Sequence, residues 1–122
     1  MDIAMRSFPQ VLILDVSGDL DMYNAHRLRE AAARIIRTER RAVIVNLKAV
    51  PYIDSSGVAA LLAINAQMAG RARPFRIINA RGPVLRVMEL TQLTGFLPLS
   101  PSELDAIESV QESQPPAASR SA

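Results

Sequence analysis

Runs of aliphatic and β-branched residues predict the strands of this chain. Two of these runs, at 11–17 and 42–47, are almost continuously apolar and do not alternate between apolar and polar residues, and a third predicted strand lies at 75–79. A strand that is apolar on both faces must be covered on both faces, so these runs predict neighbours in a buried parallel sheet. A shorter run at 3–6 predicts an edge strand, and 96–97 predicts a last short strand.

Apolar residues that recur every three or four positions predict helices between these strands. The helices expected from this periodicity lie at 22–38, at 58–69, from Pro83 onward and at 103–112. Asp21 is expected to cap the start of the first helix, and Gly70 to end the second. Ser100 or Ser102 is expected to cap the last helix.

The last helix and the segment after it differ in character. Leu104, Ile107 and Val110 lie three positions apart and are expected to face inward, while the four acidic residues of the helix face solvent. The chain beyond the helix has no large apolar residue. We therefore expect a folded domain at 1–112 and a disordered Ser/Pro/Ala-rich tail at 113–122.

The order of these elements predicts an α/β fold. Buried strands that are joined by helices form parallel pairs with right-handed crossovers, whereas the first strand joins its neighbour through a tight antiparallel turn. We therefore expect a mixed, mostly parallel sheet of four to five strands with helices packed on it.

The composition excludes several kinds of chemistry. Apolar residues make up 49% of the chain, which is enough for a core, and there is no cysteine. Disulfides, thiolate metal sites and cysteine nucleophiles are therefore excluded. His26 is the only histidine, so imidazole-rich metal sites are not expected either.

Charge and hydropathy also limit the partners. The formal net charge is +2, from 14 basic and 12 acidic residues. Basic residues are not interleaved with aromatic ones, so we expect a solvated basic face and no direct nucleic-acid binding. No apolar run approaches the roughly 20 residues needed to span a bilayer, and there is no secretory signal pattern. We therefore expect a cytoplasmic protein that is not inserted in a membrane.

The most distinctive polar motif is Asp54-Ser55-Ser56-Gly57, which lies between the strand at 42–47 and an apolar helix. Asp54 or one of the serines is the expected helix N-cap, and Gly57 would allow a close backbone approach in the first turn. On this spacing alone, helix capping is the more economical interpretation.

The sequence gives little support for a catalytic role of the same motif. It is not Gly-x-Ser-x-Gly, and His26, near the start of the first helix, is in a typical solvated position for that residue. Neither of the glycine-rich phosphate-binding motifs is present.

A second polar motif lies where the strand at 11–17 meets the first helix. It contains Asp19 and Asp21. Loops that leave the carboxyl ends of neighbouring parallel strands meet at one edge of the sheet. Asp19 and Asp21 are therefore expected to converge with Asp54 on the Ser55 hydroxyl and to form an acidic pocket.

These motifs together resemble those of the bacterial anti-sigma factor antagonists, which are small members of the STAS domain family. Three segments carry the resemblance: 18–21 (Gly-Asp-Leu-Asp), 46–57, which ends in Ile-Asp-Ser-Ser-Gly, and 83–91 (Pro-Val-Leu-Arg-Val-Met-Glu-Leu-Thr). They occur in the family's order and spacing. The Ile-Asp-Ser-Ser-Gly segment is the most specific of the three.

The resemblance implies a binding protein and not an enzyme, with no cofactor and no metal. Such proteins bind an anti-sigma factor that is also a serine kinase, and so release the sigma factor. The kinase phosphorylates the first serine after the aspartate, which is Ser55 here, and a serine phosphatase reverses this. Asp21 and Asp54 would frame the serine, and the helix from Ser56 and Gly57 onward would contribute to docking. The free protein is expected to be a monomer.

One departure concerns the end of the third helix. Gln92 stands where the family commonly has a glycine cap, and Gly95 comes later. We therefore expect this helix to run longer or to end differently.

Two other functions stay open. The chain could be a STAS-like accessory subunit of a membrane transport ATPase without a phosphorylation switch, although such proteins often lack the paired serines. It could also be a small enzyme or nucleotide-binding protein that uses the acidic pocket with Mg²⁺.

Overall fold

The five strands form one mixed sheet in the order β1-β2-β3-β4-β5. The computed structural model describes residues 1–112; the predicted tail lies outside the described residues. The strands are β1 (Asp2–Ser7), β2 (Val11–Ser17), β3 (Ala42–Ala49), β4 (Phe75–Ile78) and β5 (Leu99–Ser100). β1 is antiparallel to β2 and every other pairing is parallel, which confirms the predicted fold class.

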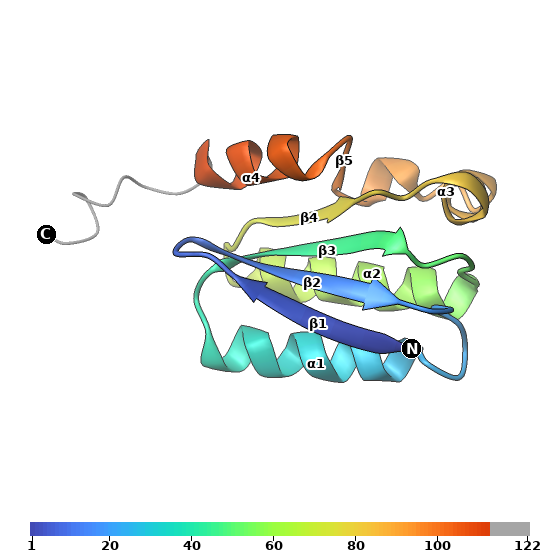
Figure 1. The fold of residues 1–122 in the computed structure, drawn as a ribbon, viewed down its shortest axis with the longest axis horizontal. Helices are drawn as coiled ribbons and strands as arrows, with labels where there is room; N and C mark the ends of the chain where they lie inside the picture. The colour runs from blue at the N-terminus through green and yellow to red at the C-terminus, as the bar shows by residue number, and fades with distance from the viewer. Residues whose placement is uncertain (113–122) are drawn as a thin grey trace, which may run out of the picture.

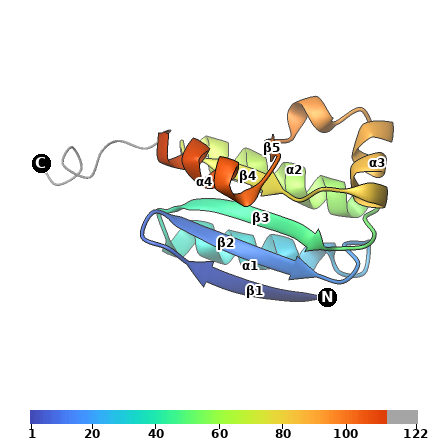
Figure 2. The same ribbon diagram turned by 45° about the horizontal axis from the view of Figure 1, so that its top comes forward.

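Helices cover both faces of this sheet. They are α1 (Ala25–Thr38), α2 (Ser55–Gly70), α3 (Gly82–Leu90) and α4 (Glu103–Glu112). α1 and α2 lie side by side on one face, and α4 lies on the other (Figures 1 and 2). Each of the long parallel strands is therefore covered on both sides.

β2 and β3 are almost continuously apolar because they contribute side chains to two separate cores. Leu14 and Val45 belong to the larger core beneath α1 and α2. Ile13 and Ile44, their neighbours along the strands, pack with Ala106 and the rest of the buried face of α4. Successive side chains of a strand point to opposite faces, so strands that serve two cores need apolar residues at almost every position.

Two predicted helix starts and one predicted strand are wrong. α1 begins at Ala25 and not at residue 22, because the residues after Asp21 form a turn; α2 begins at Ser55 and not at residue 58. The last strand is at 99–100, since the predicted residues 96–97 contribute to a short 3₁₀ helix, η1 (Thr94–Phe96), and its exit.

The predicted helix ends also need correction. Gly70 is the last residue of α2 and not its cap, and the chain reverses at Ala72, which has a φ of +53°. Ser102 does cap α4, since its hydroxyl accepts a hydrogen bond from the Asp105 amide at 3.2 Å. Leu104 is 66% exposed, so the prediction that it faces inward is wrong.

The end of α3 shows how the chain manages without the expected glycine. The helix ends at Leu90 and does not run longer. Gln92 itself adopts the left-handed conformation, with a φ of +59°. This conformation suits glycine, and other L-residues adopt it at a cost.

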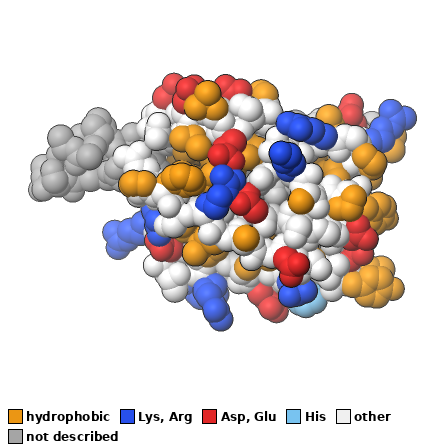
Figure 3. All heavy atoms as spheres, viewed as in Figure 1, with side chains coloured by type: hydrophobic (Ala, Val, Ile, Leu, Met, Phe, Trp, Pro, Cys, Tyr) orange, Lys and Arg blue, Asp and Glu red, His pale blue; other side chains and the backbone are white. Residues whose placement is uncertain are grey.

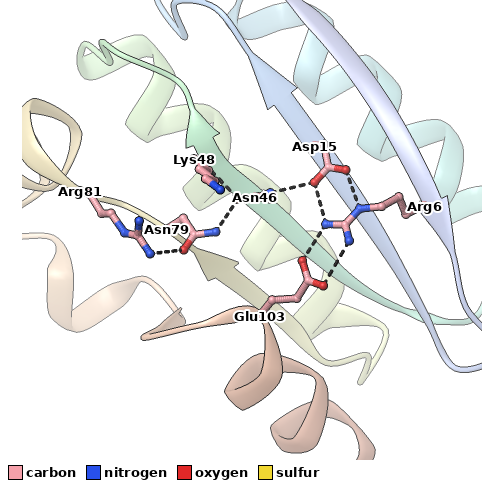
Figure 4. A network of polar contacts seen from close by, with 7 residues as sticks. All are labelled: Arg6, Asp15, Asn46, Lys48, Asn79, Arg81 and Glu103. Atoms are coloured by element: carbon pink, nitrogen blue, oxygen red, sulfur yellow. Dashed lines mark hydrogen bonds and ion pairs between the residues drawn. The ribbon is translucent and has the colours of Figure 1, made fainter.

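A polar network crosses the α4 face of the sheet near the carboxyl ends of the strands (Figure 4). The Arg6 guanidinium bonds to both oxygens of Asp15, at 2.6 and 2.9 Å, and to both oxygens of Glu103, at 3.1 and 2.7 Å. Asp15 also accepts a hydrogen bond from Asn46, which in turn accepts one from Asn79. Glu103 therefore fastens the start of α4 to β1 and does not simply face solvent.

The same network explains the charge pattern of this face. Acidic and basic side chains lie close together near its centre (Figure 3). The Arg6 hydrogen bonds hold the pKa of Asp15 below its usual value, and Asn46 adds to this lowering. The two carboxylates likewise raise the pKa of Arg6.

Replacing Gln92 by glycine should stabilise the protein by about 1 kcal/mol, because glycine adopts the left-handed conformation without steric strain. Urea unfolding followed by circular dichroism measures the change. Gln67→Gly on the exposed face of α2 is the matched control and should destabilise by about 1 kcal/mol. Equal destabilisation by both substitutions would contradict this account of Gln92.

The Arg6–Asp15 pair should make stability depend on acid pH. Asp15 stays ionised to a lower pH in the folded protein than in the unfolded chain, so its contribution is present above about pH 4 and is lost as the pH falls through the lowered pKa. Arg6→Gln should flatten this loss in urea titrations between about pH 6 and pH 2. The exposed Arg29→Gln variant should keep the wild-type slope.

Candidate functional site

The candidate site lies at the carboxyl edge of the sheet, where two loops meet. The loop after β2 and the loop after β3 form a short parallel bridge between Leu20 and Ile53. The Leu20 amide donates to the Tyr52 carbonyl at 3.0 Å, and the Asp54 amide donates to the Leu20 carbonyl at 3.3 Å. Leu20 and Ile53 are fully buried beneath this bridge, so the two loops are held together by backbone bonds and by the core.

The Asp54 carboxylate completes the junction. One oxygen, Oδ1, accepts hydrogen bonds from the amides of Ser56 and Gly57, at 2.9 and 3.1 Å, and caps α2. The other oxygen, Oδ2, accepts the Met22 amide from the loop before α1 at 2.9 Å. The prediction of an N-cap at this position is thus confirmed for Asp54, which also binds the loop that follows β2.

Gly57 is required by the closeness of that loop. A Cβ at this position would lie 2.3 Å from the Leu20 carbonyl oxygen and 2.5 Å from Ile53 Cγ1. Both distances are far below van der Waals contact. The predicted close approach is confirmed, and it places the first turn of α2 directly against the loop that follows β2.

The two serines differ in accessibility. Ser55 is the first residue of α2 and is exposed, whereas Ser56 is half-buried. The first turn of α2 contains no acidic residue of its own. The Ser55 hydroxyl therefore lies open to solvent beside the positive end of the helix dipole.

The acidic residues of the first loop serve its turn. One Asp21 carboxylate oxygen accepts the Tyr23 amide at 3.0 Å, and the Asp21 carbonyl accepts the amides of Asn24 and Ala25. Asp21 is therefore not the N-cap of α1, which is Asn24. Asp19 is exposed, and its carbonyl accepts the Asn24 side-chain amide at 3.1 Å. The two loops do meet, but only Asp54 joins them through its carboxylate.

The two loops that meet beside α2 display exposed apolar residues that the hydrophobic pattern of the sequence does not indicate. Met22 is 65%, Tyr23 75% and Tyr52 48% exposed, and they belong to the two loops that Asp54 joins. Large apolar side chains on loops that are otherwise tightly bonded are typical of binding surfaces. The sequence indicates this surface only through two tyrosines that lie beside the polar motifs, in a chain with few aromatic residues.

Two further structural findings concern residues 1–112. No three histidine, cysteine or acidic side chains in this range lie close enough together to hold a metal ion. No helix within it is long and apolar enough to cross a membrane.

Comparison with protein families gives a match over most of the chain. The family model described as the STAS domain matches residues 2–106. This range includes both loops of the candidate site and all strands of the sheet.

Individual relatives agree with this match. The anti-sigma F factor antagonist of Paenibacillus polymyxa is 23% identical over 112 residues, which cover 91% of this chain and 96% of the relative. The crystal structure of an anti-sigma factor antagonist from Mycobacterium paratuberculosis has a TM-score of 0.81 and 26% identity, covering 90% of this chain and 93% of that one.

A third relative is similar in fold. The structure of SpoIIAA, a Bacillus cell fate determinant, in its phosphorylated form has a TM-score of 0.66 and 19% identity. The match covers 89% of this chain and 99% of SpoIIAA.

Gly57→Ala should destabilise the protein by about 1–3 kcal/mol, because the new methyl group forces the two loops apart. The Met22 amide, which faces Asp54 across the junction, should then exchange its hydrogen faster. Gly70→Ala is the control: its Cβ would meet no described atom within 4 Å, and it should stabilise by about 0.5–1 kcal/mol. Unchanged stability and exchange in Gly57→Ala would contradict the close approach.

Proposed function

This chain belongs to the STAS domain family, and from that membership we propose that it is an anti-sigma factor antagonist. It binds, in the cytoplasm, an anti-sigma factor that is also a serine kinase, and thereby releases the sigma factor. Phosphorylation of Ser55 by that kinase ends the interaction, and a serine phosphatase restores it. The protein itself catalyses no reaction.

The observation that carries this proposal is an accessible hydroxyl within a binding surface. Ser55 is exposed at the start of α2, and the loops beside it display Met22, Tyr23 and Tyr52. A kinase that docks on these apolar side chains would have the serine within its interface. Aromatic residues and methionine are enriched at protein interfaces, where they contribute much of the binding energy.

The same geometry suits a switch by charge. A phosphate on Ser55 would carry about −1.5 to −2 charges at pH 7, beside the carboxylate of Asp54. The positive end of the α2 dipole offsets part of that charge, so the fold tolerates it. A partner that covers the phosphate must remove it from water next to Asp54, with Asp21 in the adjoining loop, which weakens binding. The switch therefore needs no change of fold.

Two of the relatives support the proposed function. The Paenibacillus relative is named an anti-sigma F factor antagonist, and SpoIIAA has a phosphorylated form. The paired serines and the capping aspartate occur here in the predicted order. An accessory subunit of a transport system would share the fold, but it would not need an exposed serine next to loops that display apolar side chains.

Protein purified from its own host should carry phosphate on Ser55, detected by intact-mass and phosphopeptide analysis. Ser55→Ala should carry none, and Ser56→Ala should keep it because the half-buried Ser56 is not the acceptor. Phosphate on Ser56 would contradict the assignment of Ser55 as the acceptor. Unmodified protein under every growth condition would count against the phosphorylation switch and favour the transport-subunit function.

The binding half of the proposal has its own comparison of variants. Ser55→Glu should lower affinity for the anti-sigma factor at least tenfold, which corresponds to about 1.4 kcal/mol. Ser55→Gln has the same size without the charge and should bind much more tightly than Ser55→Glu. Equal affinities for these two variants in titration calorimetry would exclude repulsion by charge as the mechanism.

A further inference from the structure

Within residues 1–112, no strand pairs with the outer edge of β1. β1 is the outermost strand of the sheet and pairs only with β2 within it (Figure 2). It contains neither proline nor glycine, and Met5 is 56% exposed. Exposed edges of this kind readily accept another strand.

The β1–β2 pairing fixes which backbone groups of β1 face outward. The Phe8 amide donates to the Val11 carbonyl at 2.9 Å, which begins the ladder with a hydrogen-bonded pair. Such pairs alternate along an antiparallel ladder, so the even-numbered residues of β1 bond to β2. The N–H and C=O groups of Ile3, Met5 and Ser7 therefore face the free edge.

We propose that β1 pairs antiparallel with β1 of a second copy of this chain, about a two-fold axis at Ala4. An added strand must place odd-numbered residues opposite odd-numbered ones, since only these offer outward groups. An axis at Ala4 meets this condition, because Ile3 of each copy then lies opposite Met5 of the other. Ala4 faces its own copy across a non-hydrogen-bonded pair, where the small side chain fits.

Side-chain chemistry favours this axis over one at Met5. It brings Asp2 of each copy opposite Arg6 of the other. Asp2 is exposed and has no ion pair among the described residues, while Asp15 and Glu103 use four of the five Arg6 N–H hydrogens. An axis at Met5 would also satisfy the backbone, but it would place the Asp2 carboxylate opposite Phe8.

The apolar side chains of the new ladder would also be covered by the neighbouring groove. Ile3 and Met5 line a groove between β1 and α1, whose other wall includes Arg27, Arg34 and Ile35. Pairing would bring Met5 of the second copy beside Ile3 and over the rim of this groove. Exposed apolar area is thereby removed from water on both copies.

This arrangement gives a closed dimer, and its two copies associate weakly. Two-fold pairing uses both copies' β1 edges, and the opposite edge of the sheet, β5, is only two residues long. A single ladder of about seven residues buries less than the roughly 1,000 Å² typical of stable interfaces. The dimer should therefore form at high micromolar concentration, in contrast to the monomer expected above, and it does not depend on the function proposed for Ser55.

Cross-linking through one engineered cysteine tests the axis, because the chain has no cysteine of its own. In Ala4→Cys the two thiols face each other across about 4.5–5.5 Å between Cα atoms, which suits a disulfide. In Ser7→Cys on the same strand, they would be about 20 Å apart. The experiment uses roughly 100 µM protein, a concentration at which so small an interface forms only in part. Under mild oxidation, Ala4→Cys should then form the disulfide-linked dimer at least tenfold faster than Ser7→Cys. Equal rates for these variants, or faster linking of Met5→Cys, would overturn the proposal.

Sedimentation of the unmodified chain gives an independent test. Its average mass should rise above that of the monomer as concentration approaches roughly 1 mM, as expected for a small interface. Met5→Pro removes one outward N–H without touching a bond to β2, so it should keep the folded circular dichroism spectrum and lose the rise. A wild-type mass that stays monomeric, or a rise that Met5→Pro leaves unchanged, would overturn the proposal.

Discussion

The Asp54 carboxylate accepts three backbone hydrogen bonds, two from the first turn of α2 and one from the loop before α1. Through these bonds, one side chain determines where the helix begins and where the neighbouring loop lies. Gly57 makes the arrangement possible, because any side chain there would collide with Leu20. The exposed Ser55 hydroxyl and the two loops with their apolar residues hold their positions as a result. These bonds give a surface made of loops the fixed conformation that helices and strands usually provide.

The sheet beneath this junction supplies a rigid base with two different faces. One face packs against α1 and α2 through the larger apolar core, whereas the other has an apolar part under α4 and a polar part. The polar part is satisfied internally by the network from Arg6 to Asn79. α4 is accordingly fastened by both packing and ionic bonds, and the carboxyl edge of the sheet keeps its shape from both sides.

The sequence predicted those features that depend on strong local patterns. The buried strands, their parallel order and the cap at Asp54 follow from apolar runs and from one short polar motif. The failures occurred where a local pattern competes with tertiary contacts. Asp21 looks like a helix cap, but its carboxylate and carbonyl close a turn instead. Leu104 fits a helical stripe, yet α4 buries Ala106 and Val110. Arg6 and Glu103 are 97 residues apart in sequence, and no periodicity could have joined them.

The strand order of the sheet has a consequence for how this protein forms. Each strand pairs with the strand that precedes it in the chain, from β1 to β5. The sheet can therefore grow in one direction, with each new strand adding to an edge that already exists, and no strand must be inserted between two others. Such a topology keeps the loops that have to close short, which favours rapid folding. It also allows the sheet to assemble in step with synthesis, since β1 to β3 and α1 emerge before the rest of the chain.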